Sequence, residues 1–153
     1  MVQAAPLIAT RGVNIAPTAH CTQSSLSTYS TSADEANDVV RNPERLRAFV
    51  NHTDLEENPW FLIDFGQPVS YDEILVFNRI ELPERVRHLV VDISVDGEGW
   101  HRIYTADPDA APFGGTDGHP LRITTPGYET RYIRFQLQET TCLHFVAVEV
   151  YRW

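Results

Sequence analysis

Short runs of β-branched and aromatic residues recur along the chain from Trp60 onward. Glycine, proline, asparagine or aspartate, which favour turns, fills most of the gaps between them. The clearest run is 131–137, where Tyr132, Arg134 and Gln136 alternate with apolar residues. A period of two places successive side chains on opposite faces of a strand, so this run predicts a strand with one buried face.

The same pattern predicts seven strands in this part of the chain: 60–65, 73–78, 89–95, 100–105, 121–124, 130–137 and 145–150. A further strand is predicted at 21–25, followed by a Ser- and Thr-rich loop at 26–34. Helical material is confined to 35–50, where Pro43 predicts one short turn of helix. Strands at this spacing without helices between them indicate an all-β fold, an antiparallel sandwich or barrel.

The chain has 153 residues, which is the length of one domain. We interpret residues 1–12 as an N-terminal extension, flexible or paired to a sheet edge, and residues 13–153 as a single domain. The sequence shows no internal repeat. The segment 106–120 is rich in proline, glycine and aspartate, and long loops of this kind often carry function.

The net charge of −9 argues against nucleic acid as a partner, because phosphates require a basic surface. It also disfavours membranes with anionic lipids. No apolar run has the length of a membrane span, and residues 1–10 lack the charged and apolar regions of a signal peptide. We therefore expect a soluble protein, either cytoplasmic or excised from a larger one.

Cys21 and Cys142 match no metal-binding spacing. They either form a disulfide between the first and last parts of the sheet or remain two buried thiols. Catalytic motifs such as Gly-x-Ser-x-Gly and His-Glu-x-x-His are absent from the sequence. The pairs Glu56-Glu57 and Asp107/Asp109 leave a glycosidase as a weaker alternative, and we interpret them as solvated loop charges. The expected protein is not an enzyme.

Several short motifs follow one another in the order of a known family. They are Asn14-Ile-Ala, Thr22-Gln-Ser-Ser25, Pro59-Trp-Phe-Leu-Ile-Asp-Phe-Gly66, Asn78-Arg79, Ser94-x-Asp-Gly-x-x-Trp100, Arg131-Tyr-Ile-Arg134 and Val148-Glu-Val-Tyr151. From Val13 to Trp153 the chain resembles the discoidin family, the coagulation-factor type C domains. The resemblance implies a galactose-binding-like jelly roll, a single antiparallel β-sandwich of about eight strands. It also implies that the binding loops cluster at one end.

One branch of that superfamily, the fucose-binding F-type lectins, is more similar in its loops. Those lectins hold their sugar with a histidine, an arginine 27 positions later, and a second arginine after an acidic residue. His52 and Arg79 have this spacing, and Glu81 stands at the acidic position. The position of the second arginine holds a valine flanked by Arg85 and Arg87, so either arginine is a candidate. The adjacent cysteine pair that many of these lectins carry is absent.

A sugar site of this kind also needs an aromatic face for the C–H side of the ring. Tyr29, in the loop 26–34, and Phe113, in the loop 106–120, are the candidates. The structural alternative is that Arg79 and Arg85 pair with neighbouring glutamates in a solvated charged loop.

The remaining aromatic and histidine residues receive structural interpretations. We expect Trp60 and Trp100 in the core, because each lies on a predicted strand at a packing position of the family. His88, His101 and His144 show no ligand spacing and are expected to be ordinary surface or half-buried residues.

The resemblance also implies a structural calcium site near the loop 36–38, completed by a glutamate in the last strand. Asp38, with Asp34 or Glu35, would supply oxygen ligands, which Ca²⁺ prefers. The family's glutamate position holds Ala147, and only Glu149 remains nearby. Calcium is therefore a candidate cofactor and no other is indicated.

The leading hypothesis is a lectin-like module that binds a monosaccharide or the end of a glycan and breaks no bond. Such modules gain avidity as oligomers or as tandem domains. The alternative is a discoidin-type adhesion domain that uses the same loops for a protein partner, with Phe113 as the anchor.

Overall fold

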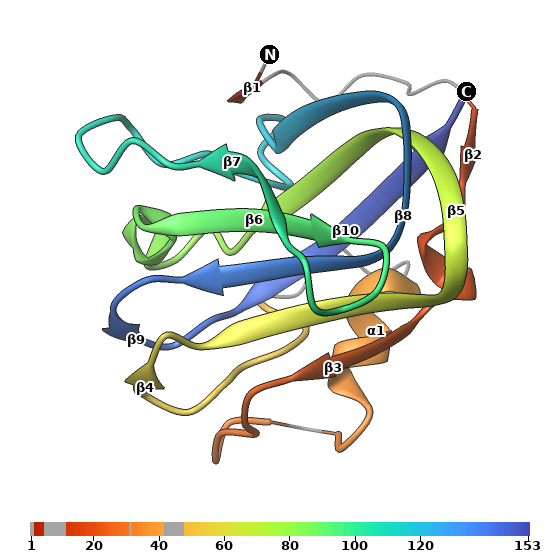
Figure 1. Ribbon diagram of the computed structural model, residues 1–153. Helices are drawn as coiled ribbons and strands as arrows, with labels where there is room; N and C mark the ends of the chain where they lie inside the picture. Colours follow the sequence, from red (N-terminus) through yellow and green to blue (C-terminus); the bar gives the residue numbers. More distant parts are fainter. Residues whose placement is uncertain (1, 5–11, 31, 42–47) are drawn as a thin grey trace.

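The computed structural model describes residues 2–4, 12–30, 32–41 and 48–153. Its main feature is an antiparallel eight-stranded sheet in the order β2-β10-β5-β8-β6-β7, with β1 paired to β8 and β3 paired to β5 (Figure 1). These strands are β1 (Val2–Ala4), β2 (Val13–Asn14), β3 (His20–Gln23), β5 (Trp60–Asn78), β6 (Leu89–Ser94), β7 (His101–Thr105), β8 (Leu121–Leu137) and β10 (Phe145–Arg152). The ribbon β4 (Glu56–Glu57) and β9 (Thr140–Thr141) is separate, and the helices are η1 (Ala16–Thr18), α1 (Glu35–Arg41) and η2 (Pro83–Val86).

The two long strands β5 and β8 bend and take part in both layers of the sandwich. Residues 60–64 of β5 pair with 132–136 of β8, and after a register shift residues 69–76 pair with 121–130. In Figure 1 both bends lie at the right, and the strands run back from them toward the end where β4 and β9 lie. One layer thus holds β3, β6 and β7, and the other holds β1, β2 and β10.

The bends use glycines with positive φ, Gly66 at 80° and Gly127 at 71°. A residue with a Cβ is strained at such angles, so glycine lets each strand turn the corner. Gly66 also donates its N–H to Oδ1 of Asp64 at 2.7 Å, and Gly127 donates to Oδ1 of Asp72 at 2.9 Å. The sequence predicted each bent strand as two strands joined by a turn, and the structure corrects this.

The core lies between the two layers. Phe61 of β5, Phe135 of β8 and Phe145 of β10 are fully buried, and their ring centroids are 5.8 to 6.1 Å apart. Tilted and edge-on rings at this spacing add aromatic attraction to the burial of apolar area. The predicted alternation in 131–137 is confirmed, because Ile133, Phe135 and Leu137 are buried and the residues between them are half-buried.

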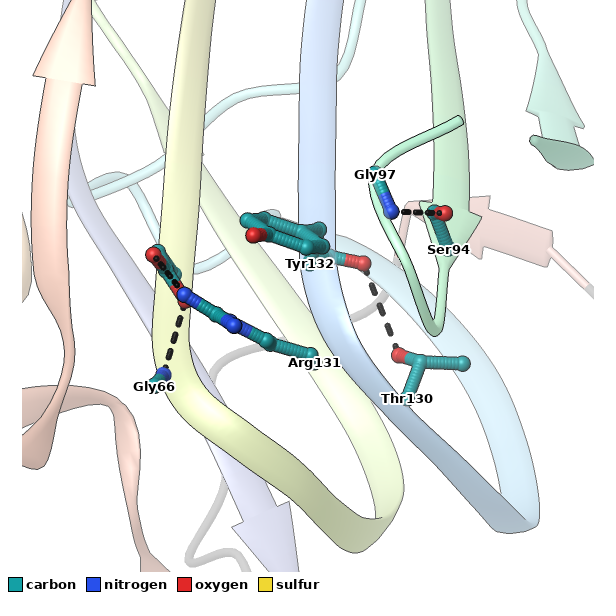
Figure 2. Close-up of polar contacts among 7 residues, drawn as sticks. Gly66, Ser94, Gly97, Thr130, Arg131 and Tyr132 are labelled. Atoms are coloured by element: carbon teal, nitrogen blue, oxygen red, sulfur yellow. Dashed lines mark hydrogen bonds and ion pairs between the residues drawn. The ribbon is translucent and has the colours of Figure 1, made fainter. Parts of the chain in front are cut away.

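Two arginines of β8, Arg131 and Arg134, contact an acidic and an aromatic side chain. The guanidinium of Arg134 lies 4.0 Å from the ring centroid of Trp100, and Arg131 forms an ion pair of 2.8 Å with Asp64. Figure 2 shows Arg131 extending from β8 toward Gly66 on β5, and Tyr132 near the turn from Ser94 to Gly97. The expectation that Trp60 and Trp100 are core residues was wrong, since both are half-buried. Trp60 directly precedes the buried Phe61, and successive strand residues point to opposite faces. Trp100 lies just before β7 and contacts Tyr132 and Arg134.

The all-β antiparallel sandwich predicted from the sequence is confirmed. The α-helix α1 lies within the range 35–50 where helix was expected, but the 3-10 helices η1 and η2 lie outside that range, so helical material is not confined to it. The short turn expected at Pro43 lies outside the described residues. Within the extension 1–12, β1 pairs with the edge strand segment of β8. Cys21 and Cys142 are both free thiols, and burial raises the pKa of Cys21 to about 12.

Candidate functional site

The candidate site is a pocket at the end of the sandwich where β5 finishes. We call it the primary pocket; its volume is about 320 Å³, and its lining residues are Tyr29, Phe49, His52, Arg79, Leu82, Arg85 and Cys142. Four of them were predicted from the sequence as site residues: Tyr29, His52, Arg79 and Arg85. They come from three separate loops, so the fold brings them together.

His52 is held by pairing between two segments far apart in the chain. Val50 and Thr53 donate backbone hydrogen bonds to the carbonyls of Phe145 and Leu143, at 2.8 and 2.9 Å. The backbone N–H of His52 also donates to Oε2 of Glu35 at 2.6 Å. The position of His52 is therefore fixed by both β10 and the first residue of α1.

The ring of His52 is buried, with 4% of the residue exposed. Its Nδ1 lies 2.7 Å from the carbonyl oxygen of Thr53, which can only accept, so Nδ1 carries the proton. Burial and the nearby Arg79 and Arg85 lower the pKa of His52, although the Thr53 hydrogen bond opposes them. The neutral ring then keeps Nε2 as a hydrogen-bond acceptor beside two cationic donors.

Arg79 follows directly after β5 and is mostly buried, with 14% of its side chain exposed. Its guanidinium lies 4.8 Å from the ring centroid of Phe49, and Nη2 is 3.7 Å from Oε1 of Glu81. Within the described chain its Nε is buried without a hydrogen-bond partner. Glu81 is itself exposed, so it serves as a counter-ion at the rim and does not line the pocket.

The structure separates the two candidates for the second arginine. Val86 is buried in the core, and its neighbours Arg85 and Arg87 diverge from η2. Arg85 lines the primary pocket, whereas Arg87 forms an ion pair of 3.2 Å with Glu139 outside it. Of the two, only Arg85 shares a pocket with His52.

His144, expected from the sequence to be an ordinary surface or half-buried histidine, is a buried residue next to this site. It is 2% exposed, and its ring centroid is 5.3 Å from that of His52. Nη1 of Arg85 donates to its Nε2 at 3.1 Å, because a guanidinium has no acceptor. Burial, then Arg79, His52 and Arg85, lower the pKa of His144 to about 3. His144 is thus a neutral acceptor behind Arg85.

Of the two aromatic residues expected to face the sugar, Tyr29 lines the primary pocket and Phe113 does not. Tyr29 is 69% exposed, and its ring centroid lies 5.5 Å from that of His52. The half-buried Phe49, which no sequence motif indicates, lies edge-on to His52 with the ring centroids 5.0 Å apart. Phe113 is 5% exposed and belongs to the core, so the expectation that it offers a face to this pocket was wrong. Nδ2 of Asn78 donates to the carbonyl of Phe113 at 2.9 Å, and this bond holds the loop 106–120 against the end of β5.

Two of the calcium ligands expected near α1, Asp34 and Glu35, are used in other contacts. Oδ1 of Asp34 accepts from Nδ2 of Asn37 at 2.7 Å, and Oδ1 of Asn37 accepts from the backbone of Cys21 at 2.8 Å. Asp38 is half-buried on α1. No group of three or more potential metal ligands occurs among the residues that the structure describes. The buried Glu35 instead supports His52 and accepts from Gln23 at 2.8 Å.

The glutamates considered for hydrolysis also have structural contacts. Oε2 of Glu56 accepts from the hydroxyl of Ser24 at 2.9 Å and from that of Ser25. Glu56 and Glu57 pair as β4 with β9. These bonds tie the ribbon to the end of β3.

The primary pocket therefore combines an imidazole acceptor, two guanidinium donors and adjacent aromatic rings on a β-sandwich.

A sequence profile of the F5/8 type C domain matches residues 18–148, and the chain belongs to this family, also called discoidin. No curated protein matches the sequence. In the described residues, no helix is both long enough and apolar enough to cross a membrane.

Solved structures with the same fold include sugar-binding proteins. A fucolectin from the serum of Morone saxatilis (striped bass) is 22% identical with a TM-score of 0.72, covering 92% of this chain and 47% of that one. The chain thus spans about half of that fucolectin. A Streptococcus pneumoniae fucose binding module is 18% identical with a TM-score of 0.73, covering 93% and 96%. CpGH89CBM32-5 from Clostridium perfringens, in complex with GalNAc-β-1,3-galactose, is 10% identical with a TM-score of 0.69, covering 92% and 100%.

Proposed function

We propose that the chain is a glycan-binding module that holds one sugar residue in the primary pocket and breaks no bond in it. The observation that supports this most is the grouping of the His52 acceptor with the donors of Arg79 and Arg85. A sugar hydroxyl both donates and accepts, so it satisfies an imidazole and a guanidinium at once. The pocket volume of about 320 Å³ suits one ring, near the lower end of ligand pockets.

Fucose is the first sugar to test. The spacing of His52 and Arg79 resembles the F-type lectins, and the fucolectin of striped bass and the fucose binding module of S. pneumoniae share the fold. Galactose and N-acetylgalactosamine are the next candidates, because the C. perfringens relative is in complex with a disaccharide of these two sugars. Tyr29 would cover the C–H side of the ring. We expect a single-site affinity of roughly 0.1–1 mM, made useful by an oligomer or a tandem domain.

Calorimetric titration with methyl α-L-fucoside, galactose and N-acetylgalactosamine tests the proposal. We expect one of them to bind, and we expect Arg79→Ala and Arg85→Ala to reduce its affinity at least tenfold. Arg87→Ala is the matched control, since Arg87 pairs with Glu139 outside the pocket. Absence of binding to every sugar at 10-fold the expected range, about 10 mM, would refute the function. Full binding by Arg79→Ala would refute the site.

The alternative is a discoidin-type protein-interaction or adhesion domain, which the imperfect lectin motif and the long loop 106–120 suggest, with Phe113 as the anchor in that loop. Phe113 is buried, so the long loop offers no such anchor there. A pull-down that survives an excess of free monosaccharide would favour a protein partner.

A further inference from the structure

The side chain of Arg79 lines two pockets. Besides the primary pocket it lines a second one of about 370 Å³, which we call the secondary pocket. The residues that matter there are Ile80 and Pro83 beside Arg79, and Pro112, Asp117 and His119 from the loop 106–120. Because one side chain borders both spaces, a ligand in the primary pocket lies next to the secondary one.

The far wall of the secondary pocket is anchored firmly to the end of β5. The backbone N–H of Asn78 donates to the carbonyl of Gly114 at 3.1 Å, and its Nδ2 donates to the carbonyl of Phe113 at 2.9 Å. Asn78 is fully buried, and so is most of Phe113. The loop is therefore held in place before any ligand binds, which lowers the entropy cost of binding.

Asp117 supplies the polar part of this wall. Its Oδ1 accepts from the backbone N–H of Gly115 at 2.9 Å and of His119 at 3.1 Å. Both of these bonds use the same oxygen, and Asp117 is exposed, so Oδ2 can accept from a hydroxyl. Ile80, with 57% exposure, and Pro112 add apolar surface suited to the C–H face of a ring.

We propose that the secondary pocket binds the second sugar of a glycan whose terminal residue occupies the primary pocket. The inference rests on the proposed function and deepens it, because the preferred ligand becomes an oligosaccharide. The second sugar would donate a hydroxyl to Asp117 and pack on Ile80 and Pro112. A neutral sugar is the ligand to test first, because its hydroxyls can donate to the carboxylate of Asp117.

Calorimetry with two matched pairs of ligands tests this: methyl α-L-fucoside against fucosyllactose, and N-acetylgalactosamine against GalNAc-β-1,3-galactose, whose terminal residue is N-acetylgalactosamine. For the pair that binds, we expect the oligosaccharide to bind at least fivefold more tightly than the monosaccharide. An oligosaccharide that binds when its monosaccharide is undetectable also supports the proposal. Equal affinities would overturn it and leave the proposed function intact. Absence of all binding would overturn both.

Two variants locate the extra affinity. Asp117→Asn keeps an oxygen for the Gly115 and His119 amides but replaces the second acceptor with a donor. Ile80→Ser removes the apolar surface. We expect each to lower the ratio of oligosaccharide to monosaccharide affinity at least threefold. The matched control is Leu55→Ser, which removes a side chain of 72% exposure outside both pockets and should keep the ratio. An unchanged ratio in Asp117→Asn and Ile80→Ser would overturn the placement.

Discussion

Arg85 donates a hydrogen bond of 3.1 Å to Nε2 of His144, so one guanidinium of the primary pocket rests on a buried imidazole. Among the residues that the structure describes, Arg85 thus has one fixed acceptor on its protein side, and its other N–H groups make no hydrogen bond there and can donate to a ligand. This contact explains why an isolated histidine near the C-terminal strand belongs to the site.

We expect His144→Leu to weaken sugar binding roughly fivefold, because the loss of one hydrogen bond to a charged group costs about 1 kcal/mol or more. His144→Gln retains a side-chain oxygen that can accept from Arg85, and it should recover most of the affinity. Titration calorimetry measures both variants, with circular dichroism as the check on folding. Equal affinities in the Leu and Gln variants would show that the Arg85 contact does not position the guanidinium.

The same histidine makes stability depend on pH. Its pKa is about 3 in the folded protein and near 6.5 in the unfolded chain. Between these values the unfolded chain binds a proton that the folded protein does not. The stabilisation is therefore complete above pH 6.5 and is lost as the pH falls toward 3, with a slope of at most about 1.4 kcal/mol per pH unit for one group.

Urea denaturation of the wild type and of His144→Gln from pH 7 to pH 4 measures this slope. The lowered pKa of His52, caused first by burial, adds a contribution of the same sign. We expect the variant to lose stability less steeply than the wild type as the pH falls. Parallel curves would contradict the assignment of a neutral His144.

The sequence predicted much of the fold because strands carry their signal locally. The alternation in 131–137 follows from the geometry of one strand and needs no partner. At the bends of β5 and β8 the sequence predicts turns instead, since a glycine that favours positive φ gives the same local signal in a turn and in a bent strand. The distinction depends on whether hydrogen bonding to the neighbouring strand continues past Gly66 and Gly127, and this is a tertiary property.

The site was predictable only where a spacing survives in the sequence. His52 and Arg79 were found by their separation. The choice between Arg85 and Arg87 depends on the direction of one turn of η2, which the sequence leaves open. His144 meets His52 through pairing of segments about 90 residues apart, for example Leu143 N–H to Oγ1 of Thr53 at 2.8 Å. No local pattern reports such a contact.

The wall of the secondary pocket has no room for a side chain at Gly115. A Cβ there would lie 2.5 Å from the carbonyl oxygen of Asn78. We expect Gly115→Ala to lower the free energy of unfolding by about 1–3 kcal/mol, because backbone on both sides must move apart. Gly99→Ala is the control, since the nearest atom to its Cβ would be 3.9 Å away. Urea denaturation compares them, and equal losses of stability in the two variants would contradict the close approach.

Leu82 stands between the two arginines in a left-handed conformation, with φ 54° and ψ 43°. Such a conformation costs a residue with a Cβ roughly 1 kcal/mol or more, and glycine avoids the cost. Replacing Leu82 also removes apolar contact, so the informative comparison is between two truncations that both lose it. We expect Leu82→Gly to be more stable than Leu82→Ala by about 1 kcal/mol, the reverse of the usual order.

Leu55 is the control: it is 72% exposed and is not among the described residues with positive φ, so Leu55→Ala should be more stable than Leu55→Gly. Chemical denaturation measures the free energy of unfolding of the Gly and Ala variants at both positions. If Ala exceeds Gly at Leu82 as well, the loop between Arg79 and Arg85 does not carry this strain.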